Sequence, residues 1–293
     1  MTLATSAPPT SSGPVIVEPV GAIDAAPQLA RRPSRIKSAA GTAAWAVVGF
    51  AVFVAIWQLA TALSASVPSP AETGRELRAL LSDPFHDGGP NDKGIGILVK
   101  NSLGRVLAGF FIAVVLGTPL GLAMGSSTRI WKAANPVIQV LRPVSPLAWF
   151  PLWLYALKEA STAGIWVIFI TSVWPIVLNT AAGASSVPND QRNVAKVFKL
   201  NRVAYVRHIL VPHCLPNIVT GMRLAMGTGW MVIVAVEMMS NQSGIGGYVW
   251  EVYNALNLAK VAALVLIIGV VGLALDLVFL RIGRAVAHQE ARS

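Results

Sequence analysis

The 293-residue sequence has few charged side chains, only 12% of the total, against 54% hydrophobic residues. Soluble domains carry about a quarter charged residues, so this scarcity excludes an ordinary soluble domain and indicates an integral membrane protein. The sequence also has a single cysteine, Cys214. One cysteine excludes an internal disulfide and a cluster of thiolate metal ligands, so folding must rest on helix packing in lipid.

Motifs for nucleotide binding and for hydrolytic chemistry are missing. The sequence has no Gly-x-x-x-x-Gly-Lys-[Ser/Thr] and no Gly-Lys dipeptide, so it has no P-loop for ATP. It also lacks His-Glu-x-x-His, Gly-x-Ser-x-Gly and Cys-x-x-Cys. The four histidines are spread over a loop, a basic segment and the C-terminal tail, which is a poor arrangement for a metal site. We therefore expect no catalytic residue, metal ligand or cofactor in this chain.

The net charge of +10 is carried by tails and loops that flank apolar runs. In membrane proteins this placement of Lys and Arg sets the orientation, so it does not indicate a nucleic-acid partner. The segments with most Lys and Arg are predicted to lie inside the cell, whereas the short outer loops carry only Lys158 and Lys260. Both termini and the basic segment 188–216 are therefore expected in the cytoplasm.

Six apolar stretches predict an all-α fold with about six transmembrane helices. Residues 1–38, rich in Ala, Pro, Ser and Thr, are predicted to be a disordered cytoplasmic tail. The first apolar run is about twenty residues long, which favours a retained span over a signal peptide. The predicted spans cover residues 43–63, 102–124, 136–157, 164–182, 217–239 and 259–280. The predicted division is a tail at 1–38, a first span and outer loop at 39–100, a membrane core at 101–283 that includes the loop 188–216, and a cytoplasmic tail at 284–293.

The third apolar stretch, 136–157, is interrupted by prolines that bracket Arg142 and Ser145. A backbone broken in this way frees carbonyl groups that lipid cannot satisfy, so the stretch must face the protein interior or a watery cavity. An anionic solute would need a cation or free backbone N–H groups along its route. The candidates for a solute pathway are Arg142, Ser145, Trp149 and Glu237.

Ionisable residues at membrane depth are costly and by default indicate function. Glu237 lies near the outer end of the fifth predicted span, where a pathway role competes with a structural one. For Arg105, Asp276 and Arg281, each near a membrane interface, pairing between helices is the favoured interpretation. In the second predicted span, Gly117 and Gly121 form a small-xxx-small pair suited to close helix packing.

The basic segment 188–216 is predicted to form two short helices, at about 188–199 and 202–210, the second closed by Pro212 and Pro216. In the first helix, Val194, Val197 and Phe198 fall at i, i+3 and i+4 and make one small apolar face. Taken alone, the segment is compatible with an amphipathic hairpin on the membrane surface.

The same segment resembles the cytoplasmic signature loop of the permease subunits of binding-protein-dependent ABC importers. That pattern is Glu-Ala-Ala, three residues, Gly, nine residues, Ile, one residue, Leu-Pro. Its spacing is kept in full, although Asn, Val, Lys and Val replace four of its residues. The aligned positions are Asn193, Val194 and Ala195, then Lys199, then Ile209, Val211 and Pro212.

Three further stretches make the chain similar to nitrate-type permeases, a branch close to bicarbonate, sulfonate and taurine permeases. They are LRPVSPLAWFPLW at 141–153, IFITSVWPIVLNTAAGASSVP at 168–188, and VEMMSNQSGIGGYVWEVYNALNL at 236–258. The resemblance implies the transmembrane fold of a type I ABC importer in a bacterial inner membrane. It also implies a second permease copy, two ATPase subunits that carry ATP and Mg, and an extracytoplasmic binding protein. The implied ATPase-coupling residues are Asn193, Val194, Ala195, Lys196, Val197, Phe198, Lys199, Ile209 and Pro212.

The resemblance leaves the solute open. Nitrate or nitrite is the leading expectation, and bicarbonate, cyanate or an alkyl sulfonate such as taurine is the alternative. A secondary transporter is an alternative of another class, but the chain shows no halves that repeat in inverted order.

Overall fold

A computed structural model describes residues 35–64, 67–89 and 92–290, without the side chains of 35–43, 196 and 287–290. The predicted disordered tail falls mostly outside these residues, but 35–38 already belong to a helix. The chain forms two compact units, Met1–Phe53 and Val54–Ser293. In the first unit, the described residues form the beginning of helix α1, Arg35–Leu63, whose apolar side chains, such as Trp45 and Phe50, are exposed.

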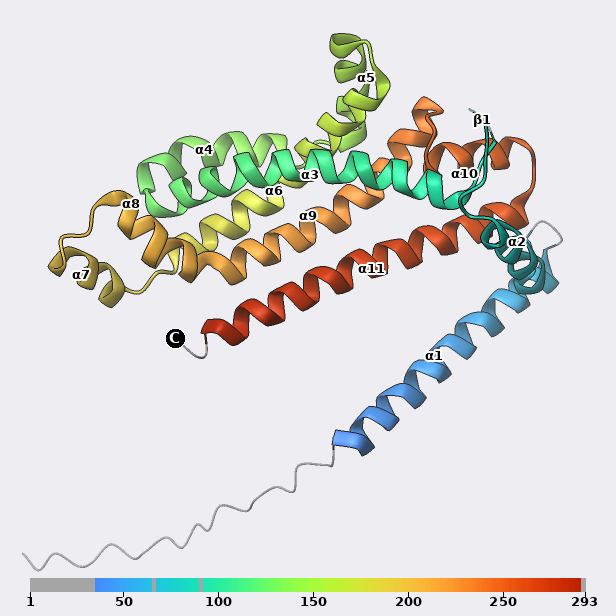
Figure 1. Ribbon diagram of the computed structural model, residues 1–293, viewed down its shortest axis with the longest axis horizontal. Helices are drawn as coiled ribbons and strands as arrows, with labels where there is room; N and C mark the ends of the chain where they lie inside the picture. The colour runs from blue at the N-terminus through green and yellow to red at the C-terminus, as the bar shows by residue number, and fades with distance from the viewer. Residues whose placement is uncertain (1–34, 65–66, 90–91, 291–293) are drawn as a thin grey trace, which may run out of the picture. The chain divides into compact units, whose positions relative to one another are not determined.

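The second unit is built almost entirely from helices (Figure 1). A short β-hairpin, with strands β1 and β2, precedes the long helix α3. The elements of the second unit after α1 are α2 Pro70–Ser82, β1 Asp87–Gly89, β2 Asp92–Lys93, α3 Ile95–Ser126, α4 Thr128–Leu141, α5 Pro146–Leu157, α6 Ala160–Ser185, α7 Asn189–Val197, α8 Arg202–Tyr205, the π-helix η1 Val206–Leu210, α9 Val211–Ser240, α10 Ile245–Asn254 and α11 Leu258–Glu290.

Five helical stretches in the described residues are long and apolar enough to cross a membrane. The third predicted span differs, because it divides into α4 and the short apolar helix α5. Between them, residues 142–145 are not helical, since Pro143 and Pro146 interrupt the ladder of backbone hydrogen bonds. The five spans cover Ala44–Leu63, Ile95–Ser126, Ala160–Ser185, Arg202–Ser240 and Leu258–Val286.

Helices α3 and α6 run parallel and form the centre of the packing. Gly109 lies against Ile168, and Gly121 lies against Thr180, so residue numbers rise together along the two helices. A side chain at Gly121 would have its Cβ 2.6 Å from the Cβ of Thr180, which confirms the predicted close approach at this glycine. Because α3 and α6 start at the same end, α4 and α5 must carry the chain back across. The broken segment is therefore a sixth crossing.

Helix α9 packs antiparallel to both α6 and α11. Gly183 lies against Asn217 and Gly164 against Val236, and the Trp230 indole donates a hydrogen bond to the Ile268 carbonyl over 3.0 Å. The buried core lies between α3, α6 and α9 and includes Val106, Ile168, Ile176 and Ile233.

The second helix of the basic segment does not end at Pro212 and Pro216, as predicted, but continues through α8, η1 and α9 as one stretch, Arg202–Ser240. Proline lacks an N–H and its ring crowds the carbonyl four residues earlier, which usually ends a helix. Here the chain widens into a π-turn just before Pro212, where the Val211 N–H donates to the Val206 carbonyl. This wider turn allows the helix to accommodate the proline.

Candidate functional site

Helix α7 has one buried face and one face exposed to solvent. Ala195, which keeps the Ala of the family pattern, is buried against the body of the chain. The predicted apolar face is exposed: Val194, Val197 and Phe198 are 50%, 77% and 73% accessible. Three neighbouring exposed apolar side chains, two on α7 and one directly after it, are suited to insertion into a partner. Asn193 is also exposed, and the Lys196 side chain lies outside the described residues.

The turn after α7 has the geometry that a glycine usually provides. Lys199, at the Gly position of the pattern, has a φ of 49°, in the left-handed region. The Leu200 N–H donates to the Ala195 carbonyl over 2.9 Å, which is the long hydrogen bond of a Schellman motif. Asn201 then caps α8 by accepting from the Ala204 N–H over 2.7 Å. The turn is therefore retained without glycine.

Lys199→Gly is expected to stabilise the protein. A non-glycine residue in the left-handed region costs about 1–2 kcal/mol, and the greater freedom of glycine in the unfolded chain cancels part of this gain. The net gain expected is about 0.5–1 kcal/mol, seen as a higher midpoint of thermal unfolding in detergent. Lys199→Ala is the control, because it removes the side chain and retains the strained Cβ. A gain in the alanine variant of equal size would contradict the explanation.

The rest of the predicted coupling set lies at the base of the hairpin. Val194, Ile209 and Pro212 line one groove between α7 and the start of the continuous helix. Behind this groove, a separate apolar cluster joins the end of α6 to η1 and α9. Its buried members are Ala184, Val187, Leu210, Cys214 and Ile218. The end of α6 and the start of the continuous helix are therefore packed together at the base of the hairpin.

The break between α4 and α5 and the first turn of α5 hold three of the pathway candidates. Arg142 caps the end of α4 and lies in a pocket with Asn135 and Gln139. Ser145 is exposed and precedes the first turn of α5. Trp149 packs against the core, and its buried indole N–H has no hydrogen-bond partner within the described residues.

Glu237, the fourth pathway candidate, is fully buried in a polar cluster near the C-terminal end of α9. Its carboxylate accepts from the Arg105 guanidinium over 2.7 Å, from the Ser102 hydroxyl over 2.7 Å and from the Gly246 N–H over 3.0 Å. Arg105 also donates to the Ser243 carbonyl over 3.1 Å. One carboxylate thus joins α3, α9 and the start of α10. The pathway role of Glu237 stays a prediction.

Pairing between helices is confirmed for two of the three residues for which it was favoured. Arg105 pairs with Glu237, and Asp276 on α11 forms a two-pronged ion pair with Arg223 on α9, at 2.6 and 2.7 Å. For Arg281 the expectation is wrong, because it forms no ion pair with any described residue.

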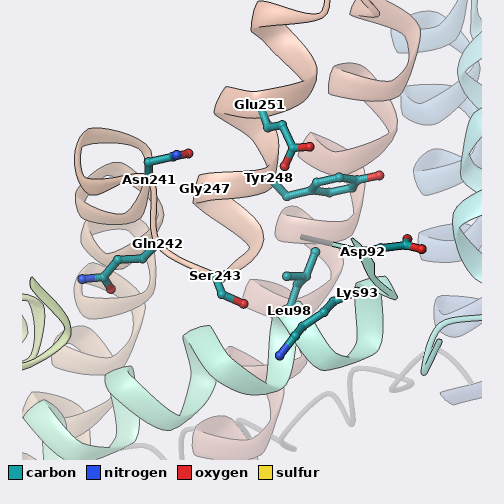
Figure 2. Close-up of a pocket in the computed structure, with 10 residues that line it drawn as sticks. Asp92, Lys93, Leu98, Asn241, Gln242, Ser243, Gly247, Tyr248 and Glu251 are labelled. Atoms are coloured by element: carbon teal, nitrogen blue, oxygen red, sulfur yellow. The ribbon is translucent and has the colours of Figure 1, made fainter. Parts of the chain in front are cut away.

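A polar pocket beside the turn 241–244, between α9 and α10, was not predicted from the sequence. Asp92 and Lys93 of β2 and Leu98 of α3 lie on one side of it, and Tyr248 and Glu251 project from α10 on the other (Figure 2). The turn 241–244 completes the lining. The lining residues from 241 to 251 lie in one of the family-like stretches, whereas Asp92, Lys93 and Leu98 do not, so the fold brings the two groups together.

Comparisons with known proteins agree with this arrangement. The profile of a family described as binding-protein-dependent transport system inner membrane component matches residues 113–288, more than half of the chain. The chain is 44% identical over 230 residues to the nitrate import permease protein NrtB of Synechocystis sp., covering 78% of this chain and 84% of that protein. It is 41% identical to the bicarbonate transport system permease protein CmpB of the same organism, with the same coverage of each.

A solved structure shows the same fold. An inward-facing structure of the MetNI methionine ABC transporter matches with a TM-score of 0.56 and 14% identity. The match covers 66% of this chain and 95% of that one. At this identity the likeness supports the fold alone.

Proposed function

Because this chain belongs to the family of binding-protein-dependent transport system inner membrane components, it is the permease subunit of an ABC importer, and we propose that its solute is nitrate or nitrite. The observation that supports this choice of solute is the similarity to nitrate import permeases, at 44%, 40% and 39% identity in three organisms. Bicarbonate is the second candidate, because a bicarbonate permease is 41% identical.

The proposed assembly contains two copies of this chain, two ATPase subunits and an extracytoplasmic binding protein. The absence of a P-loop in this sequence supports the assignment of ATP and Mg to the ATPase subunits. The exposed face of Val194, Val197 and Phe198 supports α7 as the helix that docks on them. Basic residues such as Arg192 and Lys199 can pair with an acidic rim.

The proposed orientation places α7 in the cytoplasm of a bacterial cell, with both termini on that side of the inner membrane. The clustering of Lys and Arg in the hairpin supports it. The end of α11 lies beside the start of α9, where Gly283 contacts Val219, so the C-terminal end of the last helix is on the hairpin side. The pocket next to Tyr248 and Glu251 is at the opposite end of α9, where a binding protein would deliver the solute.

The mechanism follows from the continuity of Arg202–Ser240. ATP-driven closure of the ATPase subunits would bring the two α7 helices together, and the apolar cluster at the base of the hairpin would pass this motion to α9. Since α9 reaches the outer turn through Glu237, the inner and outer ends move together. Rocking of such a rigid unit against its copy gives alternating access.

The test is uptake by proteoliposomes that contain the permease, its ATPase subunits and its binding protein. With labelled nitrate, we expect uptake that requires internal ATP and falls to background without the ATPase. Bicarbonate uptake in place of nitrate would select the second candidate. Uptake by the permease alone, without nucleotide, would identify a secondary transporter and contradict the proposal.

A further inference from the structure

Helix α4 has a continuous polar stripe along one face. Its residues are spaced by four, three, four and three positions, which keeps them on one side of a helix with 3.6 residues per turn. The opposite face carries Ile130, Val137 and Val140, all exposed. The stripe consists of Thr128, Lys132, Asn135, Gln139 and Arg142.

The direction of the neighbouring helices places this stripe across the membrane. The chain must return from the end of α3 to the start of α6, and α4 makes the first part of that return. Fourteen residues of helix extend about 21 Å, or roughly two thirds of a hydrocarbon core of about 30 Å. A surface location for α4, parallel to the membrane, would leave the short helix α5 to make the whole crossing.

The polar groups of the stripe have no protein partners that would neutralise them. Lys132 and Arg142 form no ion pair or side-chain hydrogen bond with any described residue. Asn135, Gln139 and Arg142 line a groove closed on its other side by Leu178 of α6. Lys132, near the start of α4, can reach the interface, whereas Arg142, at the end of α4, lies roughly two thirds of the way across the core, where a charge is still costly. An unpaired guanidinium at that depth requires water or an anion.

We propose that this stripe of α4 forms a wall of the anion pathway, with Lys132 as the inner cation and Arg142 as the outer one. The inference rests on the proposed transport of a small anion. The two cations are ten residues apart, or about 15 Å along the helix. The amide groups of Asn135 and Gln139 between them can donate hydrogen bonds without adding charge. Neutral donors between two cations attract an anion without holding it too tightly to leave.

The test is the water accessibility of single cysteines in the assembled transporter, with Cys214→Ala as background. Gln139→Cys is placed on the stripe and Val137→Cys on the opposite face of α4. Each is treated with a small anionic and a small cationic methanethiosulfonate reagent in proteoliposomes. We expect the cysteine at 139 to react at least roughly tenfold faster than that at 137, and faster with the anionic reagent.

A second arm removes the outer cation. Arg142→Ala should reduce the ratio of anionic to cationic labelling at position 139 by about tenfold, because the two side chains are one helical turn apart. It should also lower anion uptake while the complex still assembles. Arg129→Ala is the matched control, since Arg129 is exposed on α4 outside the stripe.

The possible outcomes distinguish a failure of the proposed pathway wall from a failure of the proposed solute. Equal labelling of positions 137 and 139, no labelling of 139, or an unchanged ratio after Arg142→Ala would each overturn the proposal. Labelling as expected together with transport of neither nitrate nor bicarbonate would retain the wall and refute the proposed solutes. Transport of nitrate with faster labelling at position 137 than at 139 would retain the proposed solute and refute the wall.

Discussion

Phe198→Glu is expected to abolish ATP-driven uptake and ATPase binding while leaving the permease folded in the membrane. The phenyl ring is 73% exposed, so its replacement costs little folding free energy. In the assembled transporter, however, a groove that receives Val194, Val197 and Phe198 would have to bury a carboxylate. Loss of a central aromatic anchor weakens an interface by about 2–4 kcal/mol, or roughly 30-fold or more in affinity.

The measurement is the binding of purified ATPase to the permease in detergent, with uptake as the second readout. Phe85→Glu is the matched control for ATPase binding, because Phe85 is 71% exposed and precedes α3 at the opposite end of the spans. It makes the same chemical change away from the hairpin. Uptake at the parent rate in Phe198→Glu, or equal loss of ATPase binding in both variants, would remove α7 from the coupling role.

The parts of the fold that the sequence predicted are those set by local composition. Apolar runs located the spans, and Gly117 with Gly121 indicated a helix face suited to close packing, because both patterns involve residues near one another in the chain. That α6 is the partner of this face was not predicted. The break at Arg142 was also predictable, since Pro143 and Pro146 remove hydrogen-bond donors wherever they stand. The parallel direction of α3 and α6 was not, because it depends on contacts between distant residues.

The features that the sequence did not predict are those that several residues decide together. Pro212 was expected to end a helix, but the π-turn at Val206–Leu210 accommodates it, and no local pattern distinguishes these outcomes. Lys199 takes a left-handed conformation that favours glycine, because the hydrogen bonds of the turn hold it there. The ion pair of Glu237 joins residues 132 positions apart, and a charge pattern has no information at that range.

Glu237→Ala is expected to cause a large loss of stability. The substitution leaves Arg105, whose side chain is only 16% exposed, without its carboxylate, and leaves Ser102 and Gly246 without an acceptor. Removal of one partner from a buried ion pair typically costs about 3–5 kcal/mol. The midpoint of thermal unfolding in detergent measures the loss. Glu251→Ala is the matched control, because Glu251 is an exposed carboxylate on α10 and should change stability by less than about 0.5 kcal/mol.

A double substitution separates the ion pair from the loss of packing. Arg105→Met alone leaves a buried carboxylate without its cation, whereas Arg105→Met with Glu237→Gln leaves two neutral side chains. The double variant should therefore lose less free energy of unfolding than the sum of the losses in the two single variants. Additive losses would show that the charges do not interact.

The same cluster is expected to matter for transport because it links α9 to the turn before α10. Glu237→Gln keeps the shape of the side chain and weakens the bonds to Arg105 and to the Gly246 N–H. If α9 carries motion from the hairpin to α10, this variant should hydrolyse ATP in the complex but import solute less efficiently per ATP. A proportional fall in hydrolysis and uptake would instead place the defect at the ATPase end, and would separate the role of Glu237 in folding from any role in coupling.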